Sequence, residues 1–235
     1  MSEKMVPPAE TQCKIDILSG IYERQFSELA RLRRHICSIT PFRRFSSLVE
    51  PGCGTGLLAG EIAAITDASY TGIDVSDSIL SIARRNATAR DGLNFVHADA
   101  LEYLPPADAV FSSFFLACLT DPVAFLRRAA DALAPGGFYI VFGEYNYSGI
   151  REDPPSGLTG KIMESLRREG LSIDLGGNLD AVFEEAGYET VESGFVRGKM
   201  QEPDSDFISL QLGSTDGINT HPRLSWEIGW GIYRI

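Results

Sequence analysis

The 235-residue sequence lacks long apolar runs and is short of positive charge. No stretch approaches the roughly 20 apolar residues of a membrane helix, and the polar segment 1–12 has no apolar core of a signal peptide. The 21 basic residues are outnumbered by 32 acidic ones, and the formal net charge of −11 should repel nucleic acids and anionic membranes. We therefore expect a cytoplasmic protein with no nucleic-acid partner and no membrane partner.

Cysteine is also scarce. Cys13, Cys37, Cys53 and Cys118 form no C-x-x-C pair and no zinc-ligand spacing. We expect reduced thiols rather than a disulfide framework, and no metal site. The length suits a loose tail over residues 1–13 followed by a single domain over residues 14–235 with a full hydrophobic core.

The most informative stretch is residues 47–56, with the sequence SLVEPGCGTG. A short apolar strand ends in Glu50, and a turn containing Gly52, Gly54 and Gly56 leads into an apolar helical run. A strand, a glycine loop and a helix in this order bring backbone N–H groups up to a ligand. Glycines can adopt positive φ and carry no Cβ, so a ligand can lie directly on the backbone.

The residues around the loop narrow the choice of ligand. Leu57 occupies the third glycine position of the dinucleotide fingerprint, and the loop has no lysine of the kind that a P-loop requires. The acid at the strand end, Glu50, suits a ligand with a positive ammonium group and repels a pyrophosphate. A nicotinamide or nucleotide loop stays open as an alternative at this point.

Further acids follow at regular places. Asp74 ends a second predicted strand 18 residues after Gly56, where a carboxylate can accept hydrogen bonds from both ribose hydroxyls. Ser76 is a predicted helix N-cap. Asp99 follows a third strand, and residues 133–137, with the pattern L-x-P-G-G, precede a buried strand.

Together these motifs resemble the class I S-adenosylmethionine-dependent methyltransferases of small molecules. The resemblance covers residues 45–145 and 178–235. It implies an α/β fold with a Rossmann-like seven-stranded sheet in the order 3-2-1-4-5-7-6, the last strand antiparallel and helices on both faces. It also implies S-adenosyl-L-methionine as cofactor, with S-adenosyl-L-homocysteine as its product. The implied cofactor-binding residues are Tyr22, Glu50, Gly52, Cys53, Gly54, Gly56, Asp74, Val75, Asp99, Ala100 and Ser113.

Other segments are predicted from their patterns. Residues 14–40 should form helices that cover the cofactor, broken at Gly20, with arginines 31, 33 and 34 on a solvated face. Residues 134–137 should form a turn before a short strand at 138–142. Residues 148–175 are predicted as an insertion that forms a lid, with a helix at 158–169. Residues 201–223 are expected to be irregular, before a final strand at 224–235.

The acceptor side is less defined. Glu144 and Tyr147 follow the fifth strand, and His221 lies in a later loop; we predict these three as catalytic candidates. Many small-molecule relatives have histidines at the positions of Ala117 and Cys118, and their absence here puts a histidine base from that loop in doubt.

The predicted activity is in-line methyl transfer to an oxygen or nitrogen, or less commonly a carbon or sulfur, of a small metabolite. The predicted assembly is a monomer or a homodimer. The alternatives are a module that binds S-adenosylmethionine without transferring methyl, and an enzyme that uses the sulfonium for another outcome such as cyclisation.

Overall fold

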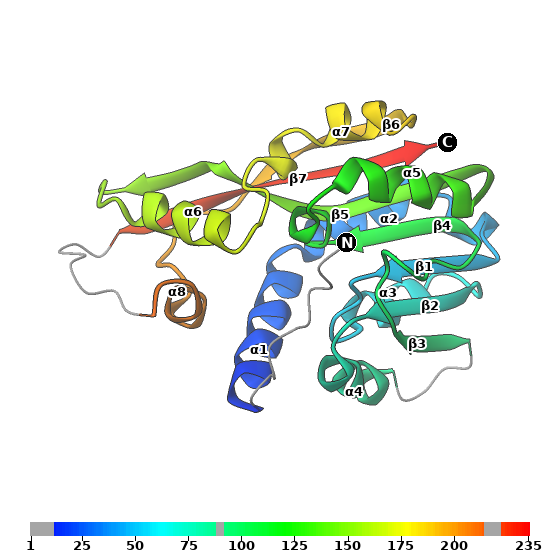
Figure 1. Ribbon diagram of the computed structural model, residues 1–235, viewed down its shortest axis with the longest axis horizontal. Helices are drawn as coiled ribbons and strands as arrows, with labels where there is room; N and C mark the ends of the chain where they lie inside the picture. Colours follow the sequence, from blue (N-terminus) through cyan, green and yellow to red (C-terminus); the bar gives the residue numbers. More distant parts are fainter. Residues whose placement is uncertain (1–11, 88–91, 214–221) are drawn as a thin grey trace. The chain divides into compact units, whose positions relative to one another are not determined.

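The computed structural model describes residues 12–87, 92–213 and 222–235 (Figure 1). The chain divides into two compact units, residues 1–105 and residues 106–235, and each is described by itself below. The predicted tail lies almost wholly outside the described residues, and the first helix begins at Gln12.

The described residues of the first unit combine three parallel strands with four α-helices. Thr71 of β2 pairs with Val49 of β1 on one side and with Asn94 of β3 on the other. The helices α3 and α4 pack against β2 through apolar side chains that are fully buried. The elements are α1 (Gln12–Glu28), α2 (Ala30–Ile39), a 3-10 turn η1 (Phe42–Arg44), β1 (Ser47–Pro51), α3 (Leu57–Ala63), β2 (Ser69–Asp74), α4 (Asp77–Asn86) and β3 (Leu93–His97).

The N-terminal helices differ from their prediction in two respects. The helix α1 continues through Gly20, and the break falls at Leu29, because one interior glycine weakens a helix by only about 1 kcal/mol relative to alanine. Arg33 is buried rather than solvated: its Nε donates to Glu61 Oε2 at 2.6 Å, and its guanidinium lies 3.4 Å from the centre of the Phe26 ring. The pair ties α2 to α3.

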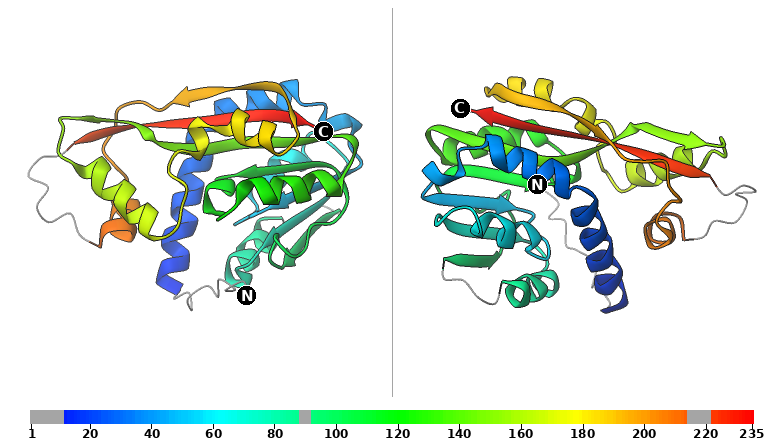
Figure 2. Two further views of the ribbon diagram at one scale, coloured as in Figure 1. Left: turned by 45° about the horizontal axis from the view of Figure 1, so that its top comes forward. Right: turned by 180° about the vertical axis from the view of Figure 1, so that it is seen from behind.

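The part of the second unit that the structure describes contains four strands. The strands β4 and β5 pair in parallel, while β7 pairs antiparallel with both β5 and β6 (Figure 2). The elements are β4 (Ala107–Ser113), η2 (Leu116–Cys118), α5 (Pro122–Ala132), β5 (Leu133–Asp153), α6 (Leu158–Arg168), η3 (Leu175–Gly177), α7 (Leu179–Glu185), β6 (Glu189–Arg197), α8 (Ser205–Leu212) and β7 (Arg223–Arg234).

The strand β5 is much longer than predicted. The predicted turn at residues 134–137 lies inside it as an irregularity, because the pairing with β4 jumps from Leu133 to Phe138 and Gly136 has a φ of 75°. At its other end β5 continues to Asp153 and pairs with the start of β7. The first residues of the predicted insertion therefore belong to the sheet, while its predicted helix is present as α6.

The prediction that residues 201–223 are irregular is wrong for α8. Asp204 caps this helix by accepting bonds from the backbone N–H groups of Asp206 and Phe207. The helices α6 and α8 lie beside the extended ends of β5 and β7, where their apolar side chains share one buried cluster (Figures 1 and 2). The polar residues around α8 led the sequence pattern to predict an irregular segment instead of a helix.

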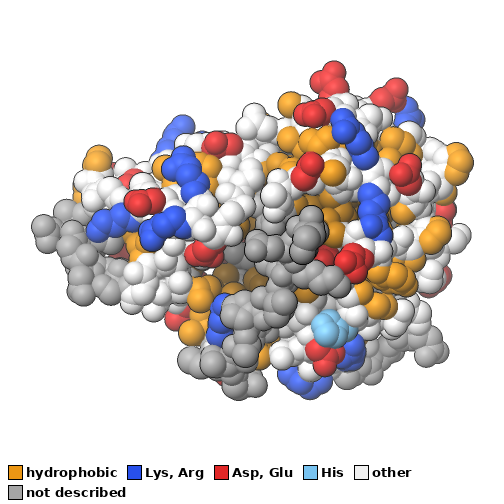
Figure 3. All heavy atoms as spheres, in the orientation of Figure 1, with side chains coloured by type: hydrophobic (Ala, Val, Ile, Leu, Met, Phe, Trp, Pro, Cys, Tyr) orange, Lys and Arg blue, Asp and Glu red, His pale blue; other side chains and the backbone are white. Residues whose placement is uncertain are grey.

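The seven strands form one sheet in the order β3-β2-β1-β4-β5-β7-β6, which confirms the predicted order and the antiparallel last strand. No helix within the described residues is long and apolar enough to cross a membrane. Acidic and basic side chains are interspersed on the face drawn in Figure 3.

Gly56, immediately before α3, generates a stability prediction. Its φ is 71°, and an added Cβ would lie 3.0 Å from the Ala83 Cβ and 3.1 Å from the Phe95 ring. We expect Gly56→Ala to lower the free energy of unfolding by about 2–4 kcal/mol through backbone strain and overpacking. Gly60, inside α3 with open space around it, is the matched control, and Gly60→Ala should stabilise by up to about 1 kcal/mol. Urea denaturation of both variants measures the difference, and equal stabilities would contradict the packing argument.

Candidate active site

The glycine loop lies between β1 and α3 in the first unit. Gly52, Gly54 and Gly56 have φ values of 66°, 53° and 71°, all in the left-handed region. Cys53 fixes the loop through its backbone, because its N–H donates to Ile73 O and its C=O accepts from Gly56 N–H, both at 3.0 Å. The predicted loop is thus present in a conformation that side chains other than glycine rarely adopt.

Asp74 joins this loop to the next helix. Its Oδ2 accepts a hydrogen bond from the Gly54 N–H at 2.9 Å, and its Oδ1 accepts one from the Ser76 N–H at 3.0 Å. Ser76 is the predicted N-cap of α4 and accepts from Ile79 N–H. An ionised carboxylate oxygen has two lone pairs, so an oxygen that accepts one N–H bond can also accept a hydroxyl.

Glu50 is buried at the carboxyl end of β1, with 3% of its surface exposed. Tyr70, on the neighbouring strand β2, donates its hydroxyl to Glu50 Oε2 at 2.5 Å. Burial is the largest effect on Glu50 and raises its pKa from 4.5 to about 8; the bond from Tyr70 opposes this rise, and nearby Asp74 adds to it. Glu50 therefore holds a proton near neutral pH unless a cation comes close.

Tyr22 of α1 lies over the glycine loop. A Cβ built on Gly54 would be 3.7 Å from the Tyr22 ring, which is an ordinary van der Waals contact. The structure thus brings Tyr22 and the loop together, as the sequence analysis expected, and leaves the Gly54 position in contact with an aromatic face.

The residues after β3 form a second part of the predicted cofactor site. Asp99 is exposed, and its Oδ1 accepts from the Leu101 N–H at 2.8 Å, while Ala100 is buried. Val75 and Leu101 are both 46% exposed, which is high for large apolar side chains. Apolar side chains left open beside an acid are suited to cover a flat, partly polar group.

Glu144 lies in β5 of the second unit and is completely buried. Its Oε1 accepts from the backbone N–H groups of Phe115 at 2.8 Å and Leu116 at 2.7 Å. Its Oε2 has no hydrogen-bond partner among the described residues. Burial raises the pKa of Glu144 to about 7, against the opposing effect of the backbone N–H bonds. The carboxylate therefore holds the turn after β4.

The remaining predicted residues are the catalytic candidates Tyr147 and His221 and the cofactor-binding candidate Ser113. Tyr147 is buried, and burial raises the pKa of its hydroxyl well above 10. This group is consequently a hydrogen-bond donor rather than a base at neutral pH. His221 lies outside the described residues. Ser113 is half-buried at the end of β4.

Comparisons with known proteins agree with this geometry. A match to the family described as a methyltransferase domain covers residues 49–141. That range contains the glycine loop, Asp74 and Asp99. Residues 49–141 thus match a methyltransferase domain, and the sheet order is the one that the resemblance to the class I fold predicted.

Two curated relatives and one solved structure illustrate the similarity. The ubiquinone biosynthesis O-methyltransferase of Caulobacter sp. (strain K31) is 34% identical over 119 residues, 48% of this chain and 46% of that protein. The 27-O-demethylrifamycin SV methyltransferase of Amycolatopsis mediterranei (strain S699) is 31% identical over 169 residues, 68% of this chain and 60% of that protein. The chain thus spans about half the length of these two relatives.

The solved structure is the N-methyltransferase NodS from Bradyrhizobium japonicum WM9 in complex with S-adenosyl-L-homocysteine. It has a TM-score of 0.57 at 16% identity, covering 90% of this chain and 86% of that chain. At this identity the likeness concerns the fold alone.

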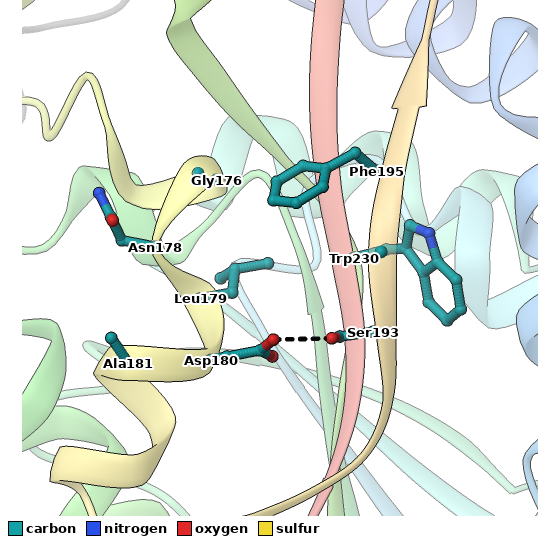
Figure 4. Close-up of a pocket in the computed structure, with 10 residues that line it drawn as sticks. Gly176, Asn178, Leu179, Asp180, Ala181, Ser193, Phe195 and Trp230 are labelled. Carbon is teal, nitrogen blue, oxygen red and sulfur yellow. Dashed lines mark hydrogen bonds between the residues drawn. The ribbon is translucent and has the colours of Figure 1, made fainter.

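A cavity of about 230 Å³ in the second unit involves none of the predicted site residues (Figure 4). It lies between the start of α7 and β6, where Ser193 donates to Asp180 Oδ2 at 2.8 Å and Tyr233 donates to Asp180 Oδ1 at 3.0 Å. This acid is already bonded, and the volume is below the roughly 300 Å³ of typical ligand sites. The cavity therefore adds nothing to the site.

Two site residues of the methyltransferase domain were missed in the sequence. Tyr70 could have been found from the pattern Tyr-x-Gly on β2. Gly72 pairs with Glu50 and leaves room for the tyrosine, because a Cβ at Gly72 would lie 2.7 Å from the Tyr70 hydroxyl. Phe114 has a φ of 54°, and no sequence pattern announces a left-handed phenylalanine.

The raised pKa values of the buried acids Glu50 and Glu144 should make the stability of the protein depend on pH. Because the folded pKa of Glu50 is raised to about 8, the folded state keeps a proton that the unfolded chain has lost. The free energy of unfolding should therefore be highest below pH 4.5 for this group and fall as pH rises towards 8, by on the order of a few kcal/mol. Glu144 adds a fall of the same sign that ends near pH 7.

Glu50→Gln keeps the acceptor for Tyr70 but cannot ionise, so it should flatten this fall. Glu184→Gln, at an exposed position on α7, is the control and should leave it unchanged. Chemical denaturation between pH 5.5 and 8.5 gives the slopes. A Glu50→Gln slope equal to that of the wild type would refute the buried, protonated state of Glu50.

Proposed function

We propose that the domain binds S-adenosyl-L-methionine and transfers its methyl group to an oxygen or nitrogen of a small-molecule acceptor. The observation that carries this proposal is the glycine loop, held open by Asp74 within the matched residues 49–141. One relative is named a ubiquinone biosynthesis O-methyltransferase and another a 27-O-demethylrifamycin SV methyltransferase. Both names favour oxygen as the acceptor atom.

The loop fits the methionine end of the cofactor. Glycines with positive φ present the backbone without a Cβ, and the Tyr22 ring forms a cover at Gly54. Glu50 ends the strand that leads into the loop, and an ammonium group close to it would stabilise the carboxylate and lower its pKa. Binding of a cation would therefore release the proton that burial keeps on Glu50.

The adenosine end fits the acids that follow. The two carboxylate oxygens of Asp74 would accept hydrogen bonds from the ribose hydroxyls in addition to the N–H bonds that they already accept. Asp99 and the Ala100 N–H would bind the edge of the adenine ring, and the exposed side chain of Val75 would cover its face.

When bound, S-adenosylmethionine supplies a sulfonium methyl group, so that an acceptor lone pair forms the new bond while the carbon–sulfur electron pair stays on sulfur. The residues of this chain then need to align the acceptor and exclude water, which lowers the barrier through orientation and desolvation. A hydroxyl acceptor also gives up its proton, either to solvent or to a base.

The methyl-transfer assay is the direct test of the function. Incubation with tritiated methyl donor and a panel of phenols, alcohols and amines should label at least one small molecule. Asp74→Ala should lower the rate by roughly 100-fold or more, because the variant loses both a cofactor contact and the bond that shapes the loop. Asp131→Ala, at an exposed position on α5, is the control and should retain the rate.

Other outcomes separate the alternatives. Binding of S-adenosylhomocysteine with no transfer to any acceptor would indicate a binding module. A converted acceptor of unchanged mass, with the donor's methyl intact, would indicate a non-methyl reaction. Either result would contradict the proposed transfer.

Glu144 supplies a second test, because its burial and its bonds to two backbone N–H groups favour a positioning role over catalysis. Glu144→Gln keeps an acceptor oxygen for those N–H groups, whereas Glu144→Ala removes it. We expect the Gln variant to keep kcat within about threefold with an unchanged pH profile, and the Ala variant to lose at least tenfold. If Glu144 were the general base, the Gln variant would lose most of its kcat and the rise of kcat with pH near 7.

A further inference from the structure

An aromatic wall runs along the second unit, made of Phe114, Tyr145, Tyr147, Trp226 and Phe207. Phe114 stacks on Tyr145 with ring centres 4.6 Å apart and planes 27° apart. The Tyr145 ring lies 5.1 Å from Tyr147 and 5.3 Å from Trp226, and the Phe207 ring lies 5.5 Å from Trp226. Four of these rings are only half-buried, with Tyr147 buried behind them.

The backbone of Phe114 is strained at its position in the wall. Among the described residues it is the only non-glycine residue with a positive φ, at 54°. For a bulky side chain this conformation is strained, and such strain concentrates where ligands bind. A glycine would adopt the same backbone conformation without strain. The strained phenylalanine therefore contributes its ring to the wall.

Glu144 keeps that backbone in place. The left-handed Phe114 is followed by Phe115 in the right-handed region, and this alternation forms a concave nest of N–H groups that binds an anion. The Glu144 carboxylate occupies the nest, accepting from Phe115 and Leu116. The Phe114 N–H also donates to Gly143 O at 2.8 Å. The acceptors of all three bonds, Gly143 and Glu144, belong to β5, which carries Tyr145 as well, so the two stacked rings are fixed to one strand.

The buried side of the wall packs into an apolar cluster. Tyr147 belongs to this cluster with Leu158 and Ile162 of α6 and Ile208 of α8, and Tyr145, Phe207 and Trp226 pack against it. A wall of this kind, in a chain with a net charge of −11, favours a neutral flat molecule over an anionic one.

We propose that the acceptor is an uncharged aromatic ring bearing a hydroxyl group, which stacks on the half-buried face of Phe114 and Tyr145. This inference rests on the proposed methyl transfer. The phenol oxygen forms the bond to the methyl carbon, the carbon–sulfur bond breaks with its pair on sulfur, and the phenolic proton passes to solvent. A phenol ionises near pH 10, far more readily than an aliphatic alcohol, so this acceptor makes the least demand for a base.

Matched ligands test the wall in the full chain. Calorimetric titration with S-adenosylhomocysteine comes first, followed by titration of the saturated protein with 1-naphthol and with its saturated counterpart, decahydro-1-naphthol. We expect the wild type to bind the aromatic alcohol about 3- to 10-fold more tightly. Phe114→Leu keeps apolar bulk without a ring, and Phe114→Gly also relieves the backbone strain, so the second variant should be at least as stable as the first.

Both Phe114 variants should lose the preference for 1-naphthol while retaining affinity for S-adenosylhomocysteine. Phe195→Leu, at a residue 59% exposed on β6 and outside the wall, should retain both. No preference in the wild type, or a preference that survives both Phe114 variants, would overturn the inference but leave the proposed function standing. A wild type that fails to bind S-adenosylhomocysteine would overturn the proposed function itself.

Discussion

The hydrogen bonds of one carboxylate, that of Asp74, organise the first unit around its glycine loop. The acid ends β2, accepts from Gly54 in the loop at 2.9 Å, and accepts from Ser76 at the start of α4 at 3.0 Å. Three left-handed glycines would otherwise leave the loop with many accessible conformations and a large entropy to lose on folding. One acid thus sets the loop shape, begins the next helix and remains able to accept a hydroxyl, so the structural and the proposed binding roles cannot be separated by deleting it.

Two other acids, Glu50 near the end of β1 and Glu144 inside β5, are buried and serve different purposes. Glu50 is paired with the Tyr70 hydroxyl, and its pKa of about 8 leaves it neutral and ready to ionise beside a cation. Glu144 has backbone N–H groups as its partners and fixes the strained turn that presents Phe114. Burying a carboxyl group is costly unless its bonds compensate, and in both cases those bonds shape a proposed ligand surface.

The loop and Asp74 could be predicted because their evidence is local: strand, glycines and acid lie close together in the sequence. The sheet order could be predicted only from the resemblance to the methyltransferase family. The burial of Arg33 and the helix α8 could not be predicted, because each depends on contacts with distant segments: Arg33 bonds to Glu61, and α8 packs with α6. The same holds for the site. The sequence placed Glu144 after the end of the fifth strand, but it lies inside β5, which continues to Asp153. Its full burial and the left-handed Phe114 were not predicted either.

The central claim is that the glycine loop of the first unit binds S-adenosylmethionine, with Glu50 facing its ammonium group. Calorimetric titration with S-adenosylhomocysteine at pH 7, in two buffers of different ionisation enthalpy, tests it most directly. The account predicts micromolar binding with release of a proton, because a pKa of about 8 should fall when the cation arrives. A folded protein that binds no S-adenosylhomocysteine but does bind a dinucleotide would contradict the account.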